Sequence, residues 1–228
     1  MNTIGVIIPC RNYERFLPEC LASLKGQLEG LPSQDLRAVV VDDYSSNPYA
    51  VQAACDDTPC IHLPEPRGVG IARNIGAAFL NTDYFLFLDA DDYLHQGAVD
   101  ALYEELRKNH LTAFAYGDYT EFARTNGTET VDVRVRTPAW DAHLLKTQNI
   151  ASYCNLWRRE AFWKIGGYSN APVAEDWVLQ RDAAGAWLAG IHVNRVVFEH
   201  RLHGENKWTK DSAQYGGLKG VSEWLNQQ

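Results

Sequence analysis

Short apolar runs alternate with amphipathic segments along the first 110 residues of the chain. The apolar runs have the length of buried strands, and the segments between them carry apolar residues at the i, i+3 and i+4 spacing of one helix face. This pattern predicts strands at 4–9, 38–41, 60–63 and 84–88, and helices at 14–27, 68–80 and 96–108. Such alternation is typical of an α/β fold with a doubly wound, mostly parallel central sheet and helices on both faces.

Two of these helices are predicted to bury particular faces. The 96–108 helix presents an apolar stripe formed by Val99, Leu102, Tyr103 and Leu106. In the 68–80 helix the inward face is expected to hold Ile71, Ile75, Ala78 and Phe79, which leaves Arg73 off that face. The Gly68-Val69-Gly70 pair lacks the third glycine of a dinucleotide-binding loop, so a Rossmann-type cofactor site is rejected.

The pattern changes after residue 111. Strands are expected at 113–119, 131–135 and 191–198, and helices at 158–165 and 175–188, with a short docking helix beyond Asp211. Gly166-Gly167 would end the first of these helices. All seven tryptophans lie from Trp140 onward, so the two halves differ in composition. We expect a single compact domain spanning 1–228.

The stretch from Tyr84 to Asp92, Y-F-L-F-L-D-A-D-D, is the most informative part of the chain. Its apolar residues predict a strand that is buried on both faces, as in a parallel sheet. Asp89, Asp91 and Asp92 would leave the sheet at the carboxyl end of that strand, which is the edge where open α/β sheets bind ligands. A divalent ion that bridges to the phosphates of a nucleotide would neutralise them. The alternative is an acidic turn that caps a helix beginning near His95.

Composition narrows the function classes. The chain has 46% hydrophobic and 22% charged residues, a net charge of −8 and a pI near 5.3. An acidic chain argues against an extended nucleic-acid-binding surface or an anionic lipid surface. Five cysteines without a C-x-x-C pair favour free thiols in a reducing compartment and no zinc site. No apolar run has the length of a transmembrane segment and no secretion signal is evident, so we expect a cytoplasmic protein.

The motifs together resemble those of family 2 glycosyltransferases with the GT-A fold. They occur in the family's order over residues 3–205, as V-I-I-P-C-R-N, V-V-V-D-D-Y-S, G-V-G-I-A-R-N-I-G, F-L-D-A-D-D, G-G-Y and A-E-D-W. The resemblance implies a nucleotide-sugar-binding half at 1–110, an acceptor-binding half at 111–200, and a C-terminal lid and docking helix at 201–228.

The resemblance also implies roles for individual nucleotide-binding residues. Asp43 would accept a hydrogen bond from the donor's base, typically the N3–H of uracil. Pro9 and Arg11 stand where the family's first loop touches the nucleoside, and Arg11 replaces a frequent Tyr. Arg73 resembles the arginine that faces the nucleotide, and Asp89 would lie toward the ribose. From the sequence alone, the alternatives are that Asp43 caps a helix or turn and that Arg73 is a solvated side chain.

A metal site is implied as well. Asp91 would bind Mn²⁺ or Mg²⁺, the ions that oxygen ligands favour, and Asp92 would cap the following helix. Near the C-terminus, enzymes of this family have a histidine that can reach the metal or the diphosphate, and His203 is the residue that best matches it. The basic stretch from His200 to Lys210 would then form a lid over the diphosphate; a surface histidine in a surface loop is the alternative.

For catalysis, the resemblance identifies Asp176 as the general base, with Glu175 beside it as an acceptor-binding candidate. A helix start favours an ionised Asp176, and ordinary N-terminal charge complementarity is the alternative explanation. The expected activity is a metal-dependent, inverting transfer of a sugar from a nucleotide diphosphate sugar, with a UDP-sugar as the favoured donor, to an acceptor hydroxyl. The acceptor is left open between glycan, lipid-linked molecule, protein and nucleobase, and a homodimer is compatible with the many tryptophans.

Two other functions share such a scaffold. A sugar-phosphate nucleotidyltransferase would need a glycine-rich basic loop after the first strand, where this chain has Pro9-Cys10-Arg11-Asn12. A non-catalytic nucleotide-sugar-binding module would not need the carboxylates required for turnover, and this chain carries all of them.

Overall fold

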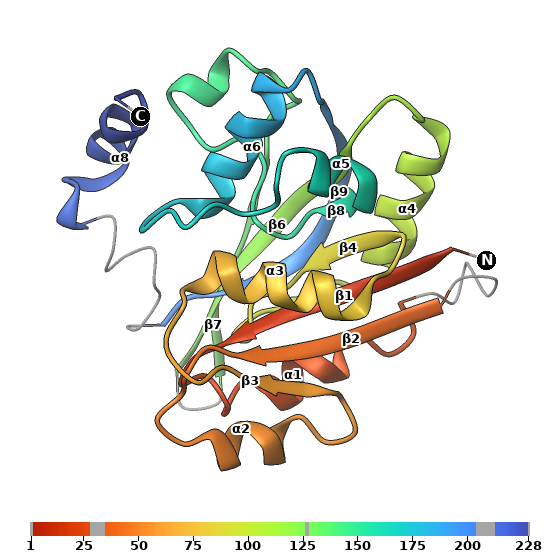
Figure 1. The fold of residues 1–228 in the computed structure, drawn as a ribbon, viewed down its shortest axis with the longest axis vertical. Helices are drawn as coiled ribbons and strands as arrows, with labels where there is room; N and C mark the ends of the chain where they lie inside the picture. Colours follow the sequence, from red (N-terminus) through yellow and green to blue (C-terminus); the bar gives the residue numbers. More distant parts are fainter. Residues whose placement is uncertain (1, 28–34, 126–127, 204–212, 228) are drawn as a thin grey trace.

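The computed structural model describes residues 2–27, 35–125, 128–203 and 213–227. Within these residues the strands form one nine-stranded sheet in the order β3-β2-β1-β4-β8-β6-β9-β5, and β7 pairs with β6 (Figure 1). The strands are β1 Thr3–Cys10, β2 Asp35–Asp42, β3 Cys60–His62, β4 Tyr84–Phe87, β5 Tyr93–Leu94, β6 Phe114–Thr125, β7 Thr128–Val135, β8 Leu156–Arg158 and β9 Gly190–Arg201. The helices are α1 Leu17–Ala22, α2 Pro48–Ala54, α3 Val69–Leu80, α4 Ala98–Lys108, η1 Leu144–Lys146, α5 Arg159–Lys164, α6 Glu175–Gly185 and α8 Gly217–Leu225.

The α/β class is confirmed, and its sheet has two different halves. The strands β1, β2, β3 and β4 pair in parallel, as the apolar runs predicted. In the second half, β8 is antiparallel to both β4 and β6, while β6 and β9 are parallel. The sheet is therefore mostly parallel only in its first half, because β8 enters between β4 and β6 in the opposite direction.

Alternate residues of the central strands face two separate cores. In β4, Leu86 packs with the core that α1, α2 and α4 cover, and Phe85 and Phe87 pack with the core that α3, α5, α6 and α8 cover. All four residues of β4 are buried, as expected for a strand covered on both sides. Figure 1 shows α3 crossing one face of β1 and β4 while α1 lies behind β2.

The expected face of α4 is confirmed, whereas that of α3 is wrong. Val99, Leu102, Tyr103 and Leu106 of α4 are buried. In α3 the buried residues are Gly70, Ala72, Arg73, Gly76 and Ala77, and Phe79 is 56% exposed. The reason is close packing: a Cβ on Gly76 would lie 2.5 Å from Cγ2 of Ile7. A helix pressed this tightly onto the sheet buries its small residues, and Arg73 goes inward with them.

Candidate functional site

The carboxyl ends of β1, β2 and β4 lie at one edge of the sheet. Cys10, the last residue of β1, is in register with Asp42, the last residue of β2. Ile7 of β1 pairs with Phe87, which ends β4. The residues that follow these strand ends, Arg11, Asp43 and Asp89, are therefore brought to the same edge, as the sequence predicted. Pro9 is buried within β1, and Arg11 is exposed just beyond it.

The exit loops of β1 and β2 are fastened to each other. Asn12 adopts a left-handed backbone (φ 60°), and its backbone N–H donates to Oγ of Ser45 at 2.8 Å. Its side-chain oxygen accepts from the backbone N–H of Ser46 at 2.8 Å. A side-chain amide of this kind replaces a backbone partner and holds a loop without regular structure.

Asp43 is 4% exposed, and its two carboxylate oxygens hold the loop before α3. Oδ1 accepts from the backbone N–H of Arg67 at 2.6 Å, and Oδ2 accepts from that of Gly68 at 2.9 Å. Gly68 has φ 88°, a conformation that side chains disfavour. Each carboxylate oxygen has a second lone pair, so Asp43 retains acceptor capacity beyond this loop.

Asp91 and His203 lie in contact although 112 positions separate them. Nε2 of His203 is 2.8 Å from Oδ2 of Asp91. The His203 ring packs against Tyr13 and Phe16, with centroid distances of 5.4 and 5.2 Å. Asp91 is 7% exposed, and burial raises the pKa of its carboxyl group. The structure thus brings together the two residues that the sequence assigned to a metal.

Asp92 does not cap α4, so that expectation is wrong. Gly97 is the N-cap of α4 and β5 comes between. Asp92 Oδ2 instead accepts from the hydroxyl of Tyr153 and lies 3.0 Å from Nδ1 of His200, and Oδ1 accepts from the backbone N–H of Arg201 at 2.7 Å. The carboxylate ties the loop after β4 to the end of β9. This tie places His203, two residues beyond β9, beside Asp91.

His200 and Arg201 of the predicted lid therefore belong to the sheet. Both are residues of β9, and Arg201 is 6% exposed. The Asp92 carboxylate raises the pKa of His200 to about 9, against the opposing effect of burial. The remainder of the predicted lid, 204–210, lies outside the described residues.

Arg73 joins the two halves of the candidate site. It is 1% exposed and donates through Nη2 to Oδ1 of Asp89 at 2.7 Å and through Nη1 to Oε1 of Glu175 at 2.8 Å. Its guanidinium also stacks on Tyr153 and Tyr168, 5.4 and 5.0 Å from the ring centroids. A buried arginine needs paired charges around it, and here the partners are the carboxylate after β4 and the first residue of α6.

Asp176 follows Glu175 in the first turn of α6. Ala174 before them has a left-handed backbone (φ 55°), the kind of strain that concentrates at functional sites. Asp176 Oδ2 accepts from Nδ2 of Asn149 at 2.6 Å. Desolvation, with a smaller contribution from the charge of Glu175, raises the pKa of Asp176 to about 6. The helix start was expected to favour the ionised form, but burial outweighs that effect and moves the pKa of the group upward.

Asn149 and Gln180 are residues that the sequence did not single out. Gln180, one turn after Asp176 and fully buried, donates through Nε2 to Oδ1 of Asn149 at 2.7 Å. Its side chain also binds both backbone groups of Ala151. The i, i+4 spacing of Asp176 and Gln180 was visible, but nothing in the sequence placed Asn149 on that helix face.

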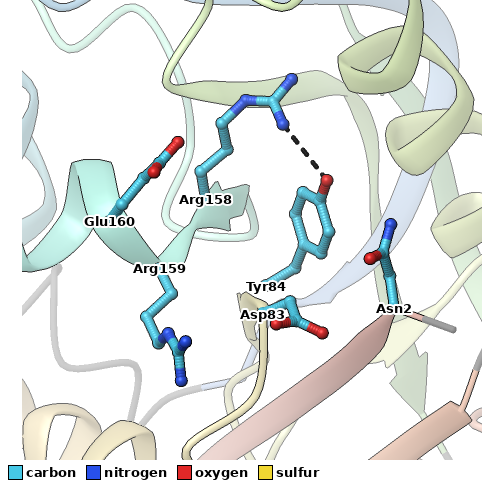
Figure 2. Close-up of a pocket in the computed structure, with 6 residues that line it drawn as sticks. All are labelled: Asn2, Asp83, Tyr84, Arg158, Arg159 and Glu160. Carbon is cyan, nitrogen blue, oxygen red and sulfur yellow. Dashed lines mark hydrogen bonds between the residues drawn. The ribbon is translucent and has the colours of Figure 1, made fainter.

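A metal site formed by protein groups alone is not present in the described residues: no three His, Cys, Asp or Glu side chains are grouped to hold an ion. Two open surface cavities lie away from the predicted site residues. One of about 200 Å³ lies at the opposite edge of the sheet, beside the starts of β1 and β4, where Arg158 donates to the Tyr84 hydroxyl at 3.1 Å (Figure 2). Another of about 690 Å³ is lined by residues of α1, α2 and the turn that follows α2. None of the predicted site residues lines either cavity.

The sequence relatives define the class of this protein. The model of the family described as glycosyl transferase family 2 matches residues 5–166. The chain therefore belongs to glycosyl transferase family 2. It is 36% identical over 103 residues to a pre-mycofactocin glycosyltransferase of Mycobacterium tuberculosis, covering 43% of this chain and 20% of that protein. It is 24% identical over 233 residues to a chondroitin synthase of Escherichia coli, covering 98% of this chain and 32% of that protein.

The fold has a solved counterpart. The structure of S. aureus TarS residues 1–349 in complex with UDP-GlcNAc superimposes with a TM-score of 0.69 at 17% identity, over 90% of this chain and 60% of that one. This similarity confirms the GT-A type fold. The chain spans between a fifth and three fifths of the lengths of these three proteins. No helix in the described part of the chain is long and apolar enough to cross a membrane.

Proposed function

We propose that this protein is a metal-dependent, inverting glycosyltransferase that moves a sugar from a UDP-sugar to an acceptor hydroxyl. The observation that carries the proposal is the double ion pair of Arg73 with Asp89 and Glu175. It links Asp89, the carboxylate proposed to face the donor, to Glu175 at the start of α6, the residue before Asp176. Membership of glycosyl transferase family 2 supports the same activity.

The donor would be bound at the exits of β1, β2 and β4. Asp43 would accept from the N3–H of uracil with a lone pair that its contacts to Arg67 and Gly68 leave available. Pro9 and Arg11 would lie against the nucleoside, and Asp89, fixed by Arg73, would face the ribose. A uridine donor is also consistent with TarS, which was solved with UDP-GlcNAc.

Asp91 and His203 fit a divalent cation. Ligands bound at about 2.1 Å and at right angles lie roughly 3 Å apart, close to the 2.8 Å between Oδ2 of Asp91 and Nε2 of His203. Mg²⁺ and Mn²⁺ usually keep waters or phosphate oxygens in their remaining positions. When bound, such an ion would stabilise the charge that develops on the leaving diphosphate.

Asp176 would act as the general base. A carboxylate with a pKa of about 6 is ionised at neutral pH yet basic enough to accept a proton in the transition state. The acceptor oxygen would form its bond to the anomeric carbon while the bond to the UDP oxygen breaks on the opposite face. The acceptor proton would pass to Asp176, UDP would leave with the bonding electrons, and the anomeric centre would invert. Glu175, held by Arg73, would bind the acceptor.

One experiment separates this activity from its alternatives. The purified protein is incubated with Mn²⁺ and UDP-sugars, with and without a panel of acceptors, and the products are identified by mass spectrometry and NMR. Transfer with inversion and release of UDP supports the proposal. Formation of a nucleotide sugar from a sugar phosphate would identify a nucleotidyltransferase, and donor binding without turnover under any condition would identify a binding module.

The remaining parts of the proposal concern the C-terminal segment and the cellular location. The segment after His203 would close over the diphosphate as a lid. The short helix α8, in which Val221 and Leu225 are buried, is joined to η1 by the hydrogen bond from Ser222 to the Lys146 carbonyl. All five cysteines are described and free, which supports a reducing, cytoplasmic location.

A further inference from the structure

Tyr168 carries a buried hydroxyl for which the described residues supply no hydrogen-bond partner. The residue is 3% exposed and follows Gly166-Gly167. Buried polar groups in native proteins nearly always have a partner, so an exception requires an explanation. Burial raises the pKa of this phenol, which keeps it a neutral hydrogen-bond donor.

The position of Tyr168 is fixed from several sides. Asn74 binds both of its backbone groups: Nδ2 donates to the carbonyl of Tyr168 at 2.8 Å and Oδ1 accepts from its N–H at 2.9 Å. The ring packs edge-on against Phe87, with centroids 5.0 Å apart. The Arg73 guanidinium lies over the same ring, 5.0 Å from its centroid. A hydroxyl on so constrained a ring is held in one place in the absence of any ligand.

The surroundings of Tyr168 belong to the candidate site. Phe87 ends β4, two residues before Asp89, and Arg73 pairs with that carboxylate. The charges of Asp176, Glu175 and Asp89 all act on the phenol and raise its pKa. A second buried polar atom without a partner in the described residues, Nε of Arg73, lies in the same place.

We propose that the Tyr168 hydroxyl hydrogen-bonds the sugar moiety of the bound donor and thereby contributes to sugar selection. This inference rests on the proposed glycosyltransferase function. In the proposed reaction the transferred sugar lies between the carboxylates after β4 and the base. Tyr168 contacts both Phe87, which ends the strand leading to Asp89, and Arg73, which is joined to Glu175. A sugar hydroxyl both accepts and donates hydrogen bonds, so it would supply the partner that the described protein groups do not give the Tyr168 hydroxyl.

The test compares Tyr168→Phe with a matched variant, Tyr116→Phe. Tyr116 is also fully buried, but its hydroxyl donates to the Pro138 carbonyl at 2.8 Å. Without ligand, Tyr116→Phe should lower the Tm, whereas Tyr168→Phe should leave it unchanged or raise it, because no protein hydrogen bond is lost. By calorimetry with Mn²⁺, Tyr168→Phe should leave the Kd for UDP unchanged and weaken UDP-glucose or UDP-N-acetylglucosamine roughly 2- to 12-fold, the loss of one hydrogen bond.

Deoxy-sugar donors identify the atom involved. Removing the sugar hydroxyl that Tyr168 contacts should weaken binding to the native protein and leave the affinity of Tyr168→Phe unchanged. Equal donor affinities for the native protein and Tyr168→Phe, or a Tm loss in Tyr168→Phe as large as in Tyr116→Phe, would overturn the inference while the glycosyltransferase function stands. Failure of the native protein to bind UDP and every UDP-sugar would instead refute the proposed function, and this inference with it.

Discussion

The Nδ2 of Asn149 donates a hydrogen bond of 2.6 Å to Oδ2 of Asp176, the carboxylate that we propose as the base. Asn149 lies in the loop before β8, and Gln180 holds it from the same helix that carries Asp176. A base oriented by a neighbour that is itself held is the usual arrangement in sites that transfer a proton. This relationship makes both chemistry and pH dependence testable.

Asp176→Asn should depress kcat while sparing donor affinity. Loss of positioned proton transfer typically costs roughly 10²–10⁴-fold in rate, and the amide keeps the shape of the carboxylate. Turnover at saturating acceptor and the Kd for UDP are the two measurements. Glu175→Gln is the companion variant and should raise the KM for acceptor more than it lowers kcat. Normal turnover by Asp176→Asn, or a product with retained configuration, would exclude Asp176 as the base.

The same substitution has a consequence for stability. The pKa of Asp176 is raised from 3.8 to about 6 on folding, so the folded chain binds more protons between pH 4 and 6 and loses stability as the pH rises through that window. Asp176→Asn removes this titration. Its Tm relative to the native protein should therefore be higher at pH 8 than at pH 4. A difference in Tm that is constant with pH would contradict the raised pKa.

Asn149→Ala should shift the pH–rate profile. The hydrogen bond from Asn149 favours the ionised form of Asp176, so its loss raises the pKa of the base further. The acidic limb of kcat/KM, expected near pH 6 in the native protein, should move to higher pH. Asn226→Ala is the control, because Asn226, the C-cap residue of α8, donates through Nδ2 to the Lys146 carbonyl of η1. An unmoved acidic limb in Asn149→Ala would show that Asn149 has only a structural role.

Metal dependence should follow Asp91 and His203. EDTA is expected to abolish transfer, and added Mn²⁺ or Mg²⁺ should restore it. The variants Asp91→Asn and His203→Gln should bind Mn²⁺ more weakly, as measured by electron paramagnetic resonance with UDP present. His192→Gln is a matched control, since Nε2 of His192 also lies 2.8 Å from an aspartate oxygen, that of Asp118, but outside the predicted site. Full activity in EDTA would refute the metal.

Nucleotide preference should depend on Asp43. UDP should bind more tightly than ADP or GDP, because the wrong base leaves a buried carboxylate poorly paired. Asp43→Asn should reduce this preference and also loosen the loop that Asp43 holds at Arg67 and Gly68. Asp42→Asn is the control: its carboxylate binds Ser45 and His62 instead. Calorimetry that finds ADP bound as tightly as UDP would contradict a uracil contact.

The periodicity of apolar residues correctly predicted the strands and helices that are buried along their whole length on one or both faces. The apolar run at 84–88 corresponds to β4, since a strand buried on both faces has apolar residues at every position. The apolar stripe on 96–108 corresponds to α4, since a helix buried on one face has apolar residues every three or four positions. Periodicity missed β8, which has three residues, and β5, which has two. Strands so short form because their neighbours supply the hydrogen bonds, and their own side chains carry no pattern.

In the candidate site, too, some features follow from the sequence and others arise only in the folded chain. The chain's own order placed Asp43, Asp89 and Asp91 at strand exits, since the carboxyl ends of parallel strands share one edge. The partners of these carboxylates come from distant parts of the chain. Arg73 reaches Glu175 because close packing of Gly76 on Ile7 turns the arginine inward. The contacts of Asp92 with β9, of His203 with Asp91 and of Asn149 with Asp176 span 27 to 112 positions. Only tertiary packing decides them, because no local pattern encodes which side chains meet when separate elements close over one sheet edge.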